Sequence, residues 1–258
     1  LERTFAEWKE SLFSNEVPGQ QQTCGDCHMK GRDDVAAEYD GVFFRQVHNH
    51  RMVGVDTALT EFPDMVAQKK QIEKELKSAV LGTLCVKEGE DGKGIIAVGL
   101  ENLAVGHSWP SGAAMDRRAW VELQAFDADG AIVYQTGMVP DGVAMTEVDD
   151  PNLWRIGDRG FNNAGEEVHM FWDVDVVESD LLPAPTALNP WDPNWIDIHR
   201  RREIVLDGGK PVRVTMRVRI RPMGLDILDD LIESGDLDPV YRSAMPTYTL
   251  GFTDLEWK

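Results

Sequence analysis

The chain has 258 residues, and its 42% hydrophobic and 28% charged residues are typical of a globular protein that buries a sizeable core. Its 45 acidic and 26 basic residues give a formal net charge of −19, which excludes DNA or RNA binding and favours basic partners. No run of apolar residues is long enough to cross a bilayer, so no transmembrane segment is expected in this chain.

The first predicted elements are a helix and a loop. Residues 2–14 are expected to form a short amphipathic helix, because Phe5, Trp8 and Leu12 recur on one stripe. Residues 15–34 are expected to form a loop, which contains the sequence TCGDCHMKG at residues 23–31. Two cysteines separated by two residues and followed directly by a histidine are compatible with a structural zinc site, a redox-active dithiol or a haem attachment site.

The sequence around Cys24 and Cys27 distinguishes these three kinds of site. A structural zinc site needs four ligands, and no second C-x-x-C or H-x-x-x-H is present. A thioredoxin-type dithiol follows a strand, whereas the loop sequence NEVPGQQQT precedes Cys24. The C-x-x-C-H motif of haem c supplies two thioether bonds and an adjacent imidazole, and it fits without adjustment. We therefore predict one covalently attached haem c, with thioethers to Cys24 and Cys27 and with His28 as the proximal iron ligand.

A second helix and a series of strands are predicted after the haem loop. The helix is expected over residues 60–79, where Ile72 and Leu76 recur among strong helix formers. A further helix is expected over residues 225–233, ending before Gly235. Strands are predicted at residues 79–88, 93–103, 118–130, 131–137, 168–177, 212–222 and near 248–257.

These strands indicate an antiparallel two-sheet β-sandwich of immunoglobulin-like type, so the fold class is mainly β or α+β. Residues 1–80 are expected to form a helical haem-binding segment, and residues 81–258 the sandwich domain. Along residues 212–221 every second residue is apolar, which predicts that Arg221 and the other arginines face solvent. Cys85 lies in an apolar run and is expected to be a buried thiol. Residues 140–164 and 183–202 are predicted to be long loops.

Five sequence pieces occur in an order that resembles the multihaem c-type cytochromes of bacterial respiration. They cover about residues 5 to 137 and read FAEWKES, TCGDCHM, HNHRMVGVD, GHSWPSG and RRAWVELQAFDADGAIVYQTG. The chain departs from the family pattern because it has one C-x-x-C-H motif where several are usual, and because no histidine follows Ser11. Trp109 stands where phenylalanine is usual, and Ser111 where threonine is usual. The resemblance therefore implies a reduced, single-haem member or one module of a larger assembly.

The same resemblance bears on the sixth iron ligand. Histidines of the third and fourth pieces tend to be haem ligands in the family, and they correspond here to His50 and His107. One of the two is expected to be the sixth ligand, while the other is either structural or faces a haem carried by another chain. His48 is a third choice.

The predicted function is electron transfer by a periplasmic or extracellular c-type cytochrome, because haem c is attached outside the cytoplasm. No signal peptide is present at Leu1, as is expected of a mature exported protein. The chain is expected to be a relay module or subunit of a respiratory assembly rather than an enzyme, with redox proteins and other multihaem cytochrome chains as partners. The alternative is a haem enzyme or sensor with an open sixth position, which reduces peroxide or a nitrogen oxide or binds a gas.

Overall fold

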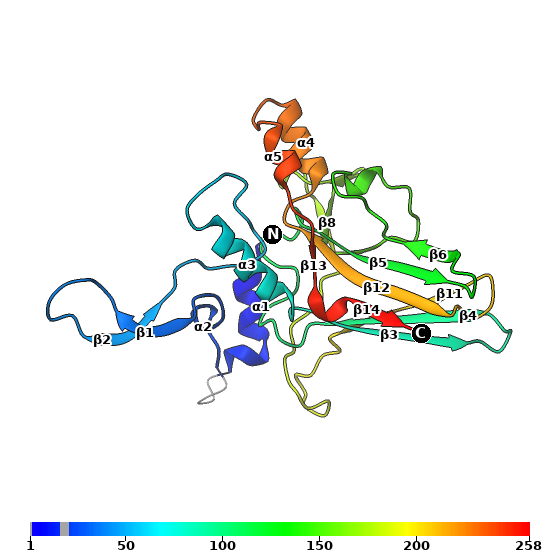
Figure 1. Cartoon of the computed structure of the whole chain (residues 1–258), viewed down its shortest axis with the longest axis horizontal. Helices are drawn as coiled ribbons and strands as arrows, with labels where there is room; N and C mark the ends of the chain where they lie inside the picture. Colours follow the sequence, from blue (N-terminus) through cyan, green and yellow to red (C-terminus); the bar gives the residue numbers. More distant parts are fainter. Residues whose placement is uncertain (1, 16–20) are drawn as a thin grey trace.

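The computed structural model describes residues 2–15 and 21–258. Within these ranges the chain begins with short helices and a hairpin and continues into a larger β-sheet body (Figure 1). Most of the loop predicted before Cys24 lies outside the described residues. The elements up to residue 80 are α1 (Thr4–Glu10), η1 (Leu12–Ser14), α2 (Cys24–His28), β1 (Gly31–Val35), β2 (Phe44–His48) and α3 (Met65–Leu76).

The remaining elements include most of the strands. The strands are β3 (Leu81–Glu88), β4 (Gly94–Glu101), β5 (Arg118–Phe126), β6 (Ile132–Thr136), β7 (Trp154–Ile156), β8 (Asp158–Phe161), β9 (Glu167–Val168), β10 (Val176–Ser179), β11 (His199–Val205), β12 (Arg213–Arg221), β13 (Tyr248–Thr249) and β14 (Leu255–Trp257). The helical turns among them are η2 (Met145–Glu147), α4 (Leu225–Glu233), α5 (Val240–Ala244) and η3 (Gly251–Thr253).

Two antiparallel sheets form a sandwich. One has the strand order β11-β4-β3, and the other has the order β13-β12-β5-β6, with β14 paired to β12 and β7 paired to β5. Val98 and Leu100 of β4 are buried in one apolar cluster with Val121 and Leu123 of β5 and with Val218 of β12. Each such aliphatic side chain contributes about 1.5–3 kcal/mol when it leaves water. The predicted fold class, a mainly β chain of antiparallel sheets with few short helices, is confirmed.

The predicted helices agree with the structure in position but not always in length. The N-terminal helix ends at Glu10, and a separate 3₁₀ turn follows, because the Ser11 side chain accepts a hydrogen bond from the Phe13 N–H instead of continuing the helix. Helix α3 is shorter at both ends than predicted. The helix over residues 225–233 is confirmed, and Gly235 follows it with a φ of +83°.

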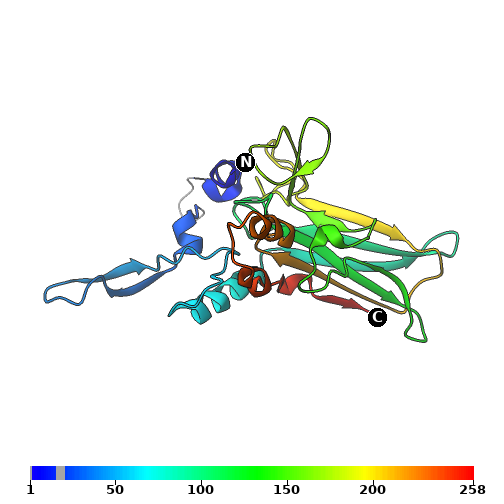
Figure 2. The same ribbon diagram turned by 90° about the horizontal axis from the view of Figure 1, so that it is seen from above.

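Several strand predictions need correction. The strand predicted over residues 168–177 is interrupted, because a turn closes where the Asp173 N–H donates to the Met170 carbonyl oxygen. The loop predicted over residues 183–202 ends in β11, which is an edge strand. Its run of arginines does not alternate with apolar residues, so the sequence pattern did not indicate a strand. A hairpin of β1 and β2 was not predicted, and it extends away from the sandwich in both views (Figures 1 and 2).

Two predictions of burial are wrong. Cys85 is exposed, because Gly82 and Val86 occupy the inward face of β3 and Cys85 lies on the opposite face. Arg221 is 1% exposed rather than facing solvent. Its guanidinium donates to the Val143 carbonyl oxygen over 3.0 Å and lies 5.6 Å from the ring centroid of Trp120, so a loop covers the outer face of β12 there.

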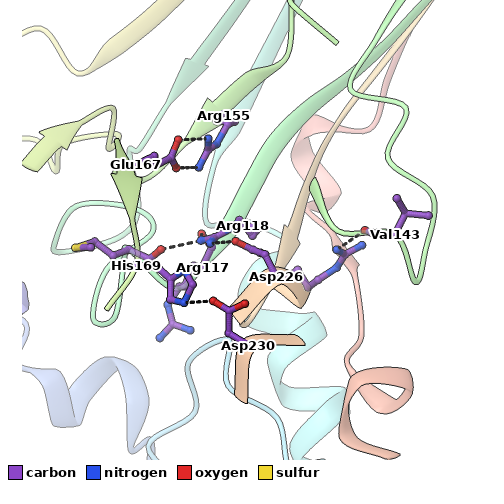
Figure 3. Close-up of polar contacts among 10 residues, drawn as sticks. Arg117, Arg118, Val143, Arg155, Glu167, His169, Asp226 and Asp230 are labelled. Carbon is purple, nitrogen blue, oxygen red and sulfur yellow. Dashed lines mark hydrogen bonds and ion pairs between the residues drawn. The ribbon is translucent and has the colours of Figure 1, made fainter. Parts of the chain in front are cut away.

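Charged side chains join α4 to β5 and to the segment after β9, and a separate ion pair joins β7 to β9 (Figure 3). The Arg118 guanidinium donates to the Asp226 carboxylate over 2.6 Å, and the shortest Arg155–Glu167 distance is also 2.6 Å. His169, expected on a strand, follows β9, and its Nε2 lies 3.0 Å from a carboxylate oxygen of Asp230. Burial by itself raises the pKa of Asp226, but the hydrogen bond and charge of Arg118 outweigh it, so this pKa lies below its ordinary value.

Candidate functional site

The C-x-x-C-H motif forms the short helix α2, and local hydrogen bonds fix where it begins. The Thr23 hydroxyl oxygen accepts a hydrogen bond from the Asp26 N–H over 3.3 Å, and the Asp26 carboxylate accepts one from the Thr23 N–H over 2.8 Å. This reciprocal arrangement is a capping box. The pattern T-x-x-D was present in the sequence, so the helix could have been predicted where a loop was expected.

Helical spacing brings the three motif side chains together. Positions i, i+3 and i+4 of a helix lie on one face, and these positions are Cys24, Cys27 and His28. All three line one cavity of about 510 Å³, a size within the range of ligand pockets. Both thiols are free. Burial, and then the charge of Asp26, raises the pKa of the Cys27 thiol, which is opposite to the lowered thiol pKa of redox-active dithiols.

Segments from distant parts of the sequence complete the cavity. Its walls come from the N-terminal helices, the end of α3 and the loops around residues 52–55 and 104–112, and most of these walls are apolar. Phe5 and Trp8 of the predicted stripe line it together with Phe13 and Trp109, whereas Leu12, the third residue of that stripe, does not. Arg117 also lines it, and its guanidinium donates to the Asp56 carboxylate over 2.7 Å and 3.0 Å.

His28 is held in one tautomer by a backbone carbonyl. Its Nδ1 lies 2.6 Å from the Val53 carbonyl oxygen, and because a carbonyl only accepts, Nδ1 carries the proton. The other nitrogen, Nε2, therefore keeps its lone pair. A histidine that donates Nδ1–H to a carbonyl while Nε2 stays free has the arrangement found in metal-ligating histidines.

His107 has the same arrangement. Its Nδ1 lies 2.8 Å from the Ser108 carbonyl oxygen, so its Nε2 is also free. Burial lowers the pKa of His107, which favours the neutral, ligating form. Asn102, which is fully buried, donates to the His107 carbonyl oxygen over 2.7 Å and accepts from the Val105 N–H over 3.0 Å. These bonds fix the loop that carries His107.

The two imidazoles line the same cavity and lie close to each other. The ring centroids of His28 and His107 are 6.2 Å apart, and the ring planes differ by 14°. Two imidazoles bound trans to one metal, each at a metal–nitrogen distance of about 2 Å, have their centroids about 6 Å apart. The spacing between these rings therefore matches that of two ligands of a single metal.

The other histidines lie elsewhere. Among the described residues, neither His48 nor His50 lines the cavity. His48 ends β2, is exposed, and has its Nδ1 2.6 Å from the Met29 carbonyl oxygen, while His50 is exposed in the turn that follows. His199 is half-buried at the start of β11, with its nitrogens 2.7 Å from Glu101 and 2.7 Å from Asp197. Of the two histidines that the resemblance offered for the sixth position, the fold brings only His107 next to His28.

The site residues that sequence patterns missed are those that position His107. Glu7 of α1 accepts hydrogen bonds from the Ser108 N–H over 3.3 Å and from the Ser111 hydroxyl over 2.8 Å. Thr4 lies 2.8 Å from the same hydroxyl. These contacts join the N-terminal helix to the loop after β4, and nothing in the sequence pairs the two segments.

The donor set fits a haem c. Two free thiols at C-x-x-C spacing reach the same apolar cavity as His28, which is what covalent attachment and proximal ligation need. A second imidazole, that of His107, lines the same cavity with its Nε2 free and its ring centroid 6.2 Å from that of His28. Arg117, whose side chain is 9% exposed, also lies on the cavity wall, where its charge is paired with the Asp56 carboxylate.

A solved structure has a fold similar to that of this chain. No known protein family matches the sequence, and no curated protein does either. A penta-heme cytochrome c552 from Thermochromatium tepidum superposes with a TM-score of 0.56 at 18% identity, over 97% of this chain and 51% of that one. The chain thus has a multihaem cytochrome-like fold and spans about half the length of this structural relative.

The structural relative bears out the fold part of the sequence resemblance. Of the described helices, none is long and apolar enough to cross a membrane.

Proposed function

We propose that this chain is a c-type cytochrome that transfers electrons through one haem, bound covalently to Cys24 and Cys27. His28 is the proximal iron ligand and His107 the sixth ligand, in preference to His50 and His48. The observation that carries the proposal is the pairing of His28 with His107 across the cavity, at 6.2 Å between ring centroids. The cavity walls and the two free thiols support it.

The residues of the chain have separate roles in this function. Val53 and Ser108 keep the Nδ1 protons in place, so that both Nε2 atoms remain available to the iron. Phe5, Trp8 and Phe13 make part of the cavity wall apolar, and a low local polarity is one determinant of redox potential. When bound, the haem supplies one-electron chemistry at the iron. Held by the imidazoles of His28 and His107, such a haem would exchange electrons without binding a substrate.

The cellular location and the partners of the protein follow from the proposed cofactor. Haem c is attached outside the cytoplasm, so the protein is periplasmic or extracellular. Its partners are redox proteins, including other multihaem cytochrome chains, and the net charge of −19 favours partners with a basic surface. A place as one relay of a larger respiratory assembly agrees with the chain matching about half of a penta-heme cytochrome.

Carbon monoxide tests the axial ligation. The reduced protein is expected to give a low-spin visible spectrum that carbon monoxide leaves unchanged, because both iron positions are filled. His107→Ala is expected to open one position, so that carbon monoxide shifts the Soret band. His50→Ala is the matched control and is expected to behave as the unsubstituted protein. A Soret shift in the unsubstituted protein would instead support the haem enzyme or sensor alternative, and a shift confined to His50→Ala would overturn the assignment of His107.

A further inference from the structure

The β1–β2 hairpin has few contacts with the rest of the protein. It extends away from the sandwich in both views (Figures 1 and 2), and we call residues 31–48 the arm. No third strand pairs with the arm, and no other element of the described residues packs extensively on it. No residue of β1 or β2 is buried. A two-stranded hairpin that packs on nothing is marginally stable in water, so the arm lacks the contacts that usually hold such a hairpin.

The end of the arm that is far from the sandwich carries large apolar side chains in solvent. Tyr39 is 81% exposed, Phe43 85% and Phe44 71%. Val35 is paired with Phe44 across the hairpin and is also exposed, so these two side chains lie together on one face. A single exposed apolar residue is ordinary, but an exposed group marks an interaction site, and aromatic residues are enriched at the centres of protein–protein interfaces.

The base of the arm is bonded to the haem-binding motif. The arm follows α2, which ends at His28. His48, at the end of β2, has its Nδ1 2.6 Å from the Met29 carbonyl oxygen, and because a carbonyl only accepts, Nδ1 donates. The Asn49 N–H donates to the Lys30 carbonyl oxygen over 3.5 Å. These bonds close the base of the arm on the residues that follow His28, so the arm begins directly beside the proposed proximal ligand.

The open side of the haem cavity lies next to this base. Met52, which follows the arm, lines the cavity and is exposed, as are the lining residues Phe5 and Cys24. A strand of five residues, the length of β2, spans about 17 Å. A small protein domain is about 30 Å across. A domain bound to the apolar end of the arm is therefore wide enough to reach back to the open side of the cavity.

The charges of the arm favour a cationic partner. The loop between its strands holds Glu38 and Asp40 and no cation. In the strands, Arg32 pairs with Asp34 over 2.9 Å, and Arg45 lies directly across from Asp34, so the two arginines of the arm lie beside a carboxylate of the arm. The whole chain has a net charge of −19, which repels a second copy and an anionic lipid surface and attracts a cationic protein.

We propose that the arm is the docking surface for a cationic redox protein. An apolar recess of that protein binds Tyr39, Phe43 and Phe44, and basic side chains around the recess face Glu38 and Asp40. The bound partner packs on the otherwise bare hairpin and covers the open side of the cavity. The redox class of the partner rests on the proposed function, because the place of the arm beside the cavity is what links the two.

Two electron acceptors of different size test the docking surface. A basic mono-haem cytochrome c is a protein probe, whereas hexaammineruthenium(III) is a small inorganic ion that needs no docking surface. One electron passes from the reduced haem of this chain to the oxidised metal of either acceptor. Isothermal titration calorimetry of the full holoprotein with the basic cytochrome is expected to show saturable binding that weakens with added salt.

The exposed aromatic side chains of the arm are expected to carry this binding. Combining Tyr39→Ser with Phe43→Ser should weaken binding of the basic cytochrome about tenfold or more. Electron transfer to that cytochrome should slow by a similar factor, while the rate with hexaammineruthenium(III) stays within about twofold. Phe171→Ser is the matched control, because Phe171 is 65% exposed but follows β9, and it should leave binding within about twofold.

Three outcomes would overturn the docking surface. The first is the absence of saturable binding of the basic cytochrome, and the second is equal binding by the unsubstituted protein and the arm variant. The third is a dimer of the unsubstituted protein in sedimentation that the arm variant dissociates, because the arm would then bind a second copy. Binding that depends on the arm, without any reduction of hexaammineruthenium(III), would instead support the docking surface and contradict electron transfer through the haem.

Discussion

The Glu7 carboxylate accepts a hydrogen bond from the Ser111 hydroxyl over 2.8 Å and so ties the N-terminal helix to the loop that carries His107. The same carboxylate accepts from the Ser108 N–H, and its side chain is only 15% exposed. Helix α1 itself buries no residue fully, so these contacts are its main attachment to that loop. The position of the His107 loop therefore depends on a residue far from it in the sequence.

Glu7→Ala is expected to loosen the His107 loop without removing a ligand. The loss of hydrogen bonds to a charged acceptor costs about 1.5–3 kcal/mol each. We expect partial carbon monoxide binding by the reduced Glu7→Ala protein, measured as the fraction of the Soret band that shifts. Glu10→Ala changes an exposed residue of the same helix and should show no shift. Equal behaviour of the two variants would contradict the positioning role of Glu7.

Covalent attachment gives a second prediction. Under denaturing conditions, the mass of the mature protein is expected to exceed the chain mass by one haem, because a single C-x-x-C-H motif is present. Cys24→Ser combined with Cys27→Ser is expected to abolish the added mass. Cys85→Ser changes the exposed third cysteine and should keep it. An added mass that survives the double substitution would show that these cysteines are not the attachment site.

How far the sequence could predict this site depends on how local each feature is. The motif at residues 24–28 was readable because all its chemistry lies within five neighbouring residues that form one helix. The choice between His50 and His107 could not be read from the sequence, because it depends on the path of the loop that carries His107, and the distant Glu7 and the buried Asn102 hold that loop. The division of the chain at residue 80 stays a prediction.

Burial along the strands could likewise be predicted only in part from the sequence. Alternation along residues 212–221 predicted the buried face of β12, since Val214, Met216, Val218 and Ile220 are buried. It was wrong for Val212, which precedes the strand and is 50% exposed. It misplaced Arg221 because alternation assumes that the second face is solvated, whereas the loop at Val143 covers that face. Cys85 was misplaced because an apolar run does not state which face of its strand is inward.

A methionine at position 107 is expected to raise the reduction potential. Methionine and histidine ligation together give higher potentials than two histidines, as in cytochromes c. His107→Met should therefore shift the midpoint potential of a spectroelectrochemical titration upward. His48→Met, at an exposed residue outside the cavity, is the control and should leave the potential unchanged. A shift in the control but not in His107→Met would exclude His107 as the sixth ligand.

The ion pair between Arg118 and Asp226 gives a prediction about acid stability. The pKa of Asp226 is lower in the folded protein than its ordinary value of 3.8, so the folded state binds the proton less readily than the unfolded chain. The stabilisation is therefore fully present above about pH 4 and is lost as the pH falls below that value through the folded-state pKa. Asp226→Asn removes this contribution and leaves Arg118, whose side chain is 5% exposed, without its carboxylate.

We expect Asp226→Asn to lower the free energy of unfolding by about 3 kcal/mol at pH 7, the usual cost of removing one partner of a buried pair. The difference from the unsubstituted protein should shrink towards pH 3, where Asp226 of the unsubstituted protein begins to take up its proton. Urea unfolding at several pH values measures both quantities. Glu233→Gln changes an exposed carboxylate of the same helix and should have little effect at either pH. A deficit that stays constant from pH 7 to pH 3 would mean that packing, and not the charge of Asp226, holds α4 on the sheet.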